Sequence, residues 1–309
     1  MNRNRIGSQV FLFTVLFTVF CLTLSFSAKV SAQETDQKTE MPENNDSGIS
    51  RKGKSVFLPR GNLFSPLIAD LKEPRFSASF IYYNGKEDNF LAGVAAFGER
   101  LNIFRYSPFG ENEGFQIGLD AGIVSIFNFE SSSINLINAD YYGGIPISWR
   151  YKNWSMRLRP YHQSSHLGDE FLLTTPVNRI NLSYEAIDFL NSFDWKTLRF
   201  YAGPEFLMRR EPANLDRWMI HGGAEWVGSS PLFGRAYPQI AVDFKSYEEH
   251  NFFVNTSAKA GISFRKSAAR FQTERKIALN LEFYYGYSPY GQFYNEKLLT
   301  AGLGASFGF

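Results

Sequence analysis

A regular alternation of apolar residues with small or polar residues is the feature that most restricts how this chain can fold. Residues 297–309, KLLTAGLGASFGF, show it clearly, because every second position is apolar and most positions between them are small or polar. Successive side chains of a β-strand point to opposite faces, so this segment is predicted to form a strand with one apolar face. The apolar set is Leu299, Ala301, Leu303, Ala305, Phe307 and Phe309.

The same alternation recurs in about twelve segments between Arg75 and Phe309, joined mostly by polar connections containing Gly, Pro, Asn or Asp. A secreted soluble sandwich would also alternate, but its polar faces would be solvated and rich in Lys and Thr. Here the second face mixes Gly, Asn, Arg, Asp and Glu, and 17% of the chain is aromatic. These features predict an all-β fold, a transmembrane antiparallel β-barrel of about 12 strands.

The first 32 residues have the pattern of a secretory signal peptide. Arg3 and Arg5 precede an apolar run over residues 10–26, and Val30 and Ala32 suit the −3 and −1 positions of a cleavage site. An N-terminal membrane anchor is the alternative, but the run is at the short end of the about 17–25 residues that span a bilayer. We therefore interpret residues 1–32 as an export signal, which together with the barrel predicts the outer membrane of a Gram-negative-type bacterium.

Three regions follow the signal. Residues 33–55 are polar and almost free of large apolar side chains, so we predict a disordered linker there. Residues 56–74 contain three prolines and are predicted to form a short periplasmic segment at the barrel mouth. Residues 75–309 form the predicted barrel, whose terminal aromatic residue, Phe309, resembles the signal read by the barrel-assembly machinery.

The content of cysteine and of charge excludes several classes of function. The single cysteine, Cys21, lies within the signal, so the mature chain has no disulfide, no cysteine catalysis and no cysteine zinc cluster. Three of the 32 basic residues also lie in the signal, which leaves 29 against 30 acidic residues. A near-neutral balance gives no electrostatic footprint for nucleic acid.

The orientation of the fifth segment follows from its two arginines. An arginine that faces hydrocarbon in mid-membrane costs about 2–4 kcal/mol, so Arg157 and Arg159 are predicted to face the lumen. His162, Ser164 and His166 have the opposite parity and are predicted to face lipid. An even number of strands places both barrel ends on the periplasmic side, so these three residues are predicted near the outer leaflet.

The apolar face of the sixth segment, VNRINLSYEAIDF, is predicted to face lipid. Asn178 has the parity of that face and opens the strand next to the one that carries His162 and Ser164. A histidine, a serine and an asparagine are therefore predicted to meet at one height on the outside of the barrel. The apolar face consists of Ile180, Leu182, Tyr184 and Ala186.

Two resemblances follow from these residues. The phrases FSPLIADLKEPRFS and YHQSSHLGDEF look like an outer-membrane barrel family of unknown function. The run His162-Gln163-Ser164, followed by Asn178-Arg179, is similar to outer-membrane phospholipase A, a twelve-stranded barrel with a His–Ser–Asn triad on its lipid-facing side. The second resemblance covers one hairpin, and it departs from that enzyme's Asn-Gly-Arg after the serine.

The resemblance to the phospholipase implies a serine acyl-ester hydrolase that acts on outer-leaflet lipid, either phospholipid or lipid A. Ser164 would be the nucleophile, His162 its general base, and Asn178 the group that orients the imidazole. Lipid A deacylases use a similar His-x-Ser pair with a glutamate as third member, but the predicted faces give no glutamate a suitable parity and position. A homodimer is a further expectation.

Calcium is also implied by the resemblance, and Asp169 and Glu170 are the candidate ligands because carboxylates suit that cation. Solvated loop charges are the commoner explanation of such residues. The non-catalytic interpretation of His162 and Ser164 is that they belong to a polar rim near the membrane surface, where a polar side chain costs about 0–1 kcal/mol.

A barrel without catalysis, either a narrow channel or a structural protein, is therefore the alternative function. The lumen is predicted to be lined by acidic and basic residues in similar numbers, which favours mutual pairing and a packed interior. Those residues are Asp120, Asp140, Arg157, Arg159, Arg199, Glu205, Glu225, Asp243, Lys245, Lys259 and Glu282.

Overall fold

The computed structural model describes residues 53–86 and 89–308, all of which belong to one compact unit, Lys52–Phe309. The predicted signal at 1–32, the linker up to residue 52 and the terminal residue, Phe309, lie outside the described residues. The last linker positions differ from the prediction, because β1 (Lys54–Phe57) forms a short strand paired with β3.

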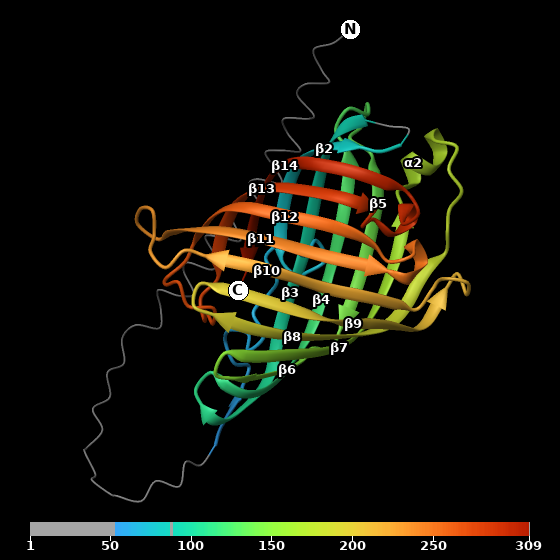
Figure 1. The fold of residues 1–309 in the computed structure, drawn as a ribbon. Coiled ribbons are helices and arrows are strands. Elements are labelled where there is room, and N and C mark those ends of the chain that lie inside the picture. The colour runs from blue at the N-terminus through green and yellow to red at the C-terminus, as the bar shows by residue number, and fades with distance from the viewer. Residues whose placement is uncertain (1–52, 87–88, 309) are drawn as a thin grey trace, which may run out of the picture. The chain divides into compact units, whose positions relative to one another are not determined.

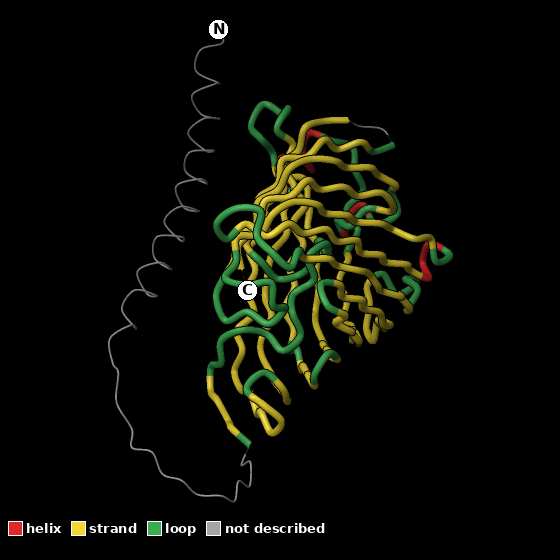
Figure 2. Tube along the Cα trace, turned by 60° about the vertical axis from the view of Figure 1, so that its left-hand side comes forward, coloured by secondary structure: helices red, strands yellow, loops and turns green. Residues whose placement is uncertain are grey.

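The structure is a closed antiparallel β-barrel of twelve strands, as predicted (Figures 1 and 2). Each wall strand pairs with its neighbours in sequence, and pairing of β14 with β2 closes the ring. The wall consists of β2 (Phe76–Asn84), β3 (Asn89–Gly110), β4 (Glu113–Asn128), β5 (Leu136–Gly144) continued by β6 (Ile147–Tyr151), β7 (Trp154–Leu167), β8 (Leu182–Trp195), β9 (Leu198–Glu211), β10 (Trp218–Val227), β11 (Ala236–Tyr247), β12 (Phe253–Phe264), β13 (Lys276–Tyr287) and β14 (Lys297–Gly308).

β5 and β6 are two halves of one wall strand. Both pair with β4 on one side and with β7 on the other. Pro146 lies at the break between them, and proline lacks the N–H that a strand donates to its neighbour. Backbone hydrogen bonds from Ile145 N to Pro160 O (2.9 Å) and from Gly118 N to Pro146 O (3.0 Å) keep the wall continuous there.

Residues 61–75 run inside the barrel. Leu63, Phe64 and Leu67 are completely buried, and the last two pack against Leu190 and Tyr201 of the wall. The backbone N–H of Leu63 donates to Gln116 Oε1 (2.8 Å), and that of Ile68 donates to Glu225 Oε1 (2.7 Å). This segment, which we predicted to lie at the mouth, therefore fills part of the lumen, and we call residues 61–75 the lumenal segment.

Most of the charged side chains that are buried in the interior form ion pairs, as expected from their balanced numbers. Arg157 bonds Glu73 of the lumenal segment (3.0 Å) and Asp188 of β8 (3.3 Å), so the ion pairs join the segment to the wall. Arg159 reaches the same Asp188 and also Asp120. Burial of a charge is tolerated when such partners surround it.

Short helices lie in the connections between strands. α2 (Asp169–Thr174) follows β7, η1 (Glu248–His250) follows β11, and η2 (Gly291–Phe293) follows β13. None of the helices within residues 53–86 and 89–308 is long and apolar enough to cross a lipid bilayer.

Candidate functional site

The strand β7 orients its side chains as the two arginines predict. Arg157, Arg159 and Ser165 are buried inside the barrel. His162 and His166 are exposed on the outer face, and Ser164 on the same face is half-buried. The histidine and serine singled out in the sequence therefore lie on the outside of the wall.

The orientation predicted for the sixth segment is wrong. Leu182, Ala186 and Leu190 of β8 are buried in the interior, and Glu185 lies on the outer face. The physical reason is that the lumenal segment packs inside the barrel, so apolar side chains also have partners there. Leu190 packs against Phe64 of the lumenal segment.

This orientation brings a carboxylate next to the histidine. In the register of β7 and β8, His162 lies directly opposite Glu185, and Ser164 lies opposite Ser183. His162 Nδ1 is 3.3 Å from Glu185 Oε1, and the two side chains are 49% and 38% exposed. A carboxylate bound to Nδ1 holds a neutral imidazole with its proton on that nitrogen and leaves Nε2 free to accept another.

Asn178 does not occupy the position that we predicted for it. It lies in the connection between α2 and β8, before the strand begins at Leu182, and it is exposed. Among the residues that the structure describes, no hydrogen bond joins Asn178 to His162, and the group that contacts the imidazole is Glu185. Because the sequence predicted the opposite orientation of β8, it placed Glu185 in the lumen and not beside His162.

Ser164 lies two residues from His162 on β7 and on the same outer face. Two residues along a strand correspond to a rise of about 7 Å, so Ser164 and His162 meet only when their side chains lean toward each other. No hydrogen bond links them within residues 53–86 and 89–308. Catalytic hydrogen bonds are often long before substrate binds, so the spacing permits a nucleophile and base without forming that pair in advance.

The wall is open beside the imidazole. Gly143 of β5 lies opposite His162, and a Cβ added there would meet one atom, the backbone oxygen of Asp120, at 3.9 Å. Tyr141, opposite Ser164, packs its ring edge-on against His166 with centroids 5.6 Å apart. The outer surface around Ser164 therefore has an aromatic flank on one side and free space next to the base.

The candidate calcium ligands do not form a calcium site. Asp169 and Glu170 begin α2 and are both exposed, and the hydroxyl of Ser133 donates to the Glu170 carboxylate. The described part of the chain has no group of three or more His, Cys, Asp or Glu side chains arranged to hold a metal ion. Because calcium takes six to eight oxygens, these two side chains do not fit it.

Comparison with known proteins places this chain in a family. Residues 10–309 match the family described as Protein of unknown function (DUF1207). The chain belongs to this family. No curated protein sequence matches the DUF1207 chain.

Solved structures of other barrels are similar to this one. An outer membrane phospholipase A from Escherichia coli matches with a TM-score of 0.49 and 13% identity, over 79% of this chain and 92% of that chain. A calcium-bound dimer of outer membrane phospholipase from Salmonella typhi matches with a TM-score of 0.48 and 12% identity, over 76% and 91%. A porin from Rhodopseudomonas blastica matches with a TM-score of 0.30 and 7% identity, over 75% of this chain and 99% of the porin chain.

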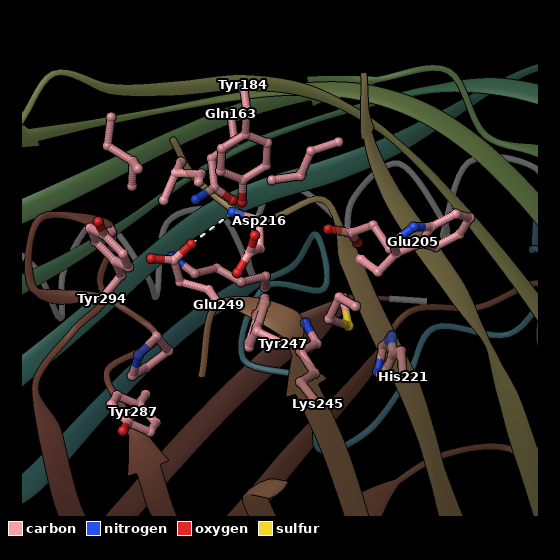
Figure 3. A pocket seen from close by; sticks show the side chains of 18 of the residues that line it. Gln163, Tyr184, Glu205, Asp216, His221, Lys245, Tyr247, Glu249, Tyr287 and Tyr294 are labelled. Carbon is pink, nitrogen blue, oxygen red and sulfur yellow. Dashed lines mark hydrogen bonds between the residues drawn. The ribbon is translucent and has the colours of Figure 1, made fainter. Parts of the chain in front are cut away.

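The DUF1207 barrel also contains a lumenal cavity that the sequence argument did not predict (Figure 3). It has a volume of about 120 Å³ and is lined by the inner faces of several strands and by the connections that hold η1 and η2. A partial sequence signal exists, because Tyr161 and Tyr247 have the same parity as the lumen-facing Arg159 and Lys245, whereas Tyr184 was predicted to face lipid. The alternation of residues could not show that these rings surround a common space.

Proposed function

We propose that this outer-membrane-type barrel is a serine acyl-ester hydrolase of the outer membrane that acts on outer-leaflet lipid. Ser164 is the nucleophile, His162 the general base, and Glu185, instead of Asn178, the group that orients the base. The observation that carries the proposal is the 3.3 Å contact between His162 Nδ1 and Glu185 Oε1, two residues from a serine on the same outer face.

The chemistry requires only these side chains and water. His162 Nε2 takes the proton of Ser164 as Oγ attacks the ester carbonyl, and Glu185 stabilises the imidazolium that forms. The imidazolium then gives its proton to the leaving alcohol oxygen. Water then attacks the acyl-serine carbonyl while the same nitrogen takes its proton. The bond between the acyl carbon and Oγ breaks, which releases a fatty acid, and the imidazolium returns the proton to Oγ, which restores the free enzyme.

The position of the site supports a lipid substrate. Toward the start of β7 and the end of β8, the outer faces of these two strands expose large apolar side chains, including Trp154, Leu158 and Phe189. Such a belt suits contact with acyl chains, and a lipid in the outer leaflet would reach Ser164 from the side. The proposal includes export through the signal at 1–32, insertion through Phe309 by the barrel-assembly machinery, and a homodimer.

A structural barrel without catalysis is the second candidate. The lumenal segment and the buried ion pairs of Arg157 and Arg159 occupy the interior, which favours a structural role over a channel. Under this alternative, His162 and Glu185 are a surface pair, which contributes about 0–1 kcal/mol to stability.

The deciding experiment measures fatty-acid release by the full mature chain refolded in detergent, with phospholipid and lipid A supplied separately. Wild type is compared with Ser164→Ala and with the matched control Ser183→Ala, which removes the neighbouring outward hydroxyl on β8. We expect release to be lost in the first variant and kept in the second, with both folded by heat-dependent gel mobility. Absence of release by wild type, with and without calcium, would refute the proposal.

A further inference from the structure

The lumenal cavity has a floor and a mouth that can be assigned from the strand register. Glu205 and Tyr247 both lie beside Met219 of β10, so they are at one level. Lys245 lies opposite His221, two residues deeper, and bonds Asp70 of the lumenal segment (2.7 Å). The cavity therefore ends on the lumenal segment. Figure 3 shows Glu205, Tyr247, His221 and Lys245 around one space.

Glu205 differs from the other carboxylates of the interior. Its side chain is 7% exposed and lines the cavity, and Tyr161 donates a hydrogen bond to Oε1 (2.7 Å). Within the described residues no cationic group lies within 4.0 Å of Glu205, and no donor reaches its second oxygen. By contrast, Asp188 has two arginine partners, and Asp70 has Lys245.

The cations closest to Glu205 in the fold are already engaged. Lys245 is bound to Asp70, and Arg159 is bound to both Asp188 and Asp120. Arg217 at the mouth also lines the cavity, and its guanidinium donates to the backbone oxygens of Leu207 and Met208. Among the described lining residues, the buried charge without an ionic partner is therefore that of Glu205. Burial of a carboxylate without a counter-ion is costly, so an incoming cation would relieve that cost.

Aromatic rings complete the lining around this carboxylate. Tyr161 reaches Glu205 diagonally across β8, where Tyr161 lies opposite Ala186 and Glu205 lies opposite Asp188. Tyr184 and Tyr247 also line the cavity. The faces of aromatic rings attract cations, and ammonium groups with methyl or alkyl substituents are recognised by such rings together with a carboxylate.

We propose that the lumenal cavity binds a small, free organic cation, with its ammonium group against Glu205 and its alkyl groups against the tyrosine rings. The volume of about 120 Å³ is well above the about 10–15 Å³ that one water needs, so there is room for such a ligand. This site lies inside the barrel and is independent of the serine on the outer wall.

The test is calorimetric titration of the refolded mature chain with choline chloride, ethanolamine hydrochloride and the uncharged isostere 3,3-dimethylbutan-1-ol. We expect both cations to bind and the alcohol to bind at least about tenfold more weakly. Glu205→Gln keeps the shape of the side chain and removes its charge, and we expect it to weaken cation binding by about tenfold or more. The matched control is Asp216→Asn, which removes an exposed carboxylate at the mouth of the same cavity and should change affinity less than about twofold.

Three outcomes would overturn the proposal. They are absence of cation binding by wild type, equal binding of the alcohol, and equal weakening by Glu205→Gln and Asp216→Asn. If Glu205→Gln does not fold, Tyr184→Leu tests the aromatic wall instead. We expect this variant to weaken choline binding by about tenfold, and unchanged choline affinity would contradict the proposal.

Discussion

His162 and Glu185 face each other directly across two neighbouring strands, on the outer side of a barrel whose interior holds many charged side chains. The imidazole Nδ1 is 3.3 Å from the carboxylate, and Ser164 follows two residues later on the same face. A histidine whose second nitrogen is free, next to a serine, has the arrangement that activates a hydroxyl.

The role of Glu185 predicts a strong effect of its removal on turnover. In Glu185→Gln the amide can donate to Nδ1 and favour the wrong tautomer, so we expect fatty-acid release to fall on the order of 10²- to 10⁴-fold. Asn178→Ala is the control, since Asn178 lies in the preceding connection, and it should keep at least about half of the wild-type rate. Equal losses in the two variants would favour Asn178 as a working part of the site.

Substitution of two adjacent glycines of β5 is predicted to affect stability very differently. Gly143→Ala adds a methyl group on the open outer face and should change the free energy of unfolding by less than about 0.5 kcal/mol. Gly144→Ala places Cβ at 2.8 Å from Tyr161 Cβ and 3.0 Å from Pro160 O, so we expect a loss of about 1–3 kcal/mol. Urea unfolding in detergent measures both, and a larger loss for Gly143→Ala would contradict this packing.

The lumenal segment predicts a large contribution from Phe64. Its ring is fully buried and lies under two guanidinium groups. The ring centroid is 5.0 Å from Cζ of Arg157 and 4.6 Å from Cζ of Arg199. We expect Phe64→Ala to reduce the free energy of unfolding by about 3–5 kcal/mol. Phe57→Ala in β1 is the control, because Phe57 is 78% exposed, and a comparable loss there would show that the segment does not anchor the barrel.

The buried ion pairs predict a dependence on Asp188 that a surface pair does not share. Asp188→Asn removes a carboxylate shared by Arg157 and Arg159, and leaving buried cations short of a partner costs about 3–5 kcal/mol. Glu274→Gln breaks the exposed pair with Lys266 and should cost about 0–1 kcal/mol. The ratio of the two losses, from unfolding curves at one ionic strength, should be at least about threefold.

His250 predicts a pH effect in the connection after β11. Burial lowers the pKa of its imidazole below the usual 6.5, although the hydrogen bond with Asn295 and the charge of Glu249 act in the opposite direction, and Lys297 adds to the lowering. The ring stacks on Tyr287 with centroids 3.6 Å apart. Because the folded pKa is lowered, this contribution to stability is present above about pH 6.5 and is lost as the pH falls through the folded pKa.

An NMR titration of the imidazole measures this pKa directly. His250→Gln is the matched variant and should show a flatter dependence of stability on pH below about 6.5 than wild type. A titration midpoint at or above 6.5 in the wild type would contradict the burial of this ring.

Local chemistry alone determined the orientation of β7. Arg157 and Arg159 cannot face hydrocarbon at an acceptable cost, and the period of two then fixes His162 and Ser164 on the outer face. The alternation of apolar and polar residues likewise determined the barrel and its twelve strands, because each strand repeats the same two-sided pattern.

Only the tertiary structure decided what the apolar faces contact. Leu182, Ala186 and Leu190 point inward because the lumenal segment fills the barrel and offers them apolar partners, so apolar character no longer distinguishes lipid from lumen on β8. That single reversal moves Glu185 to the outer face beside His162. The partner of the histidine and the tyrosine-lined cavity both depend on contacts between distant segments, and the period of one strand carries no information about them.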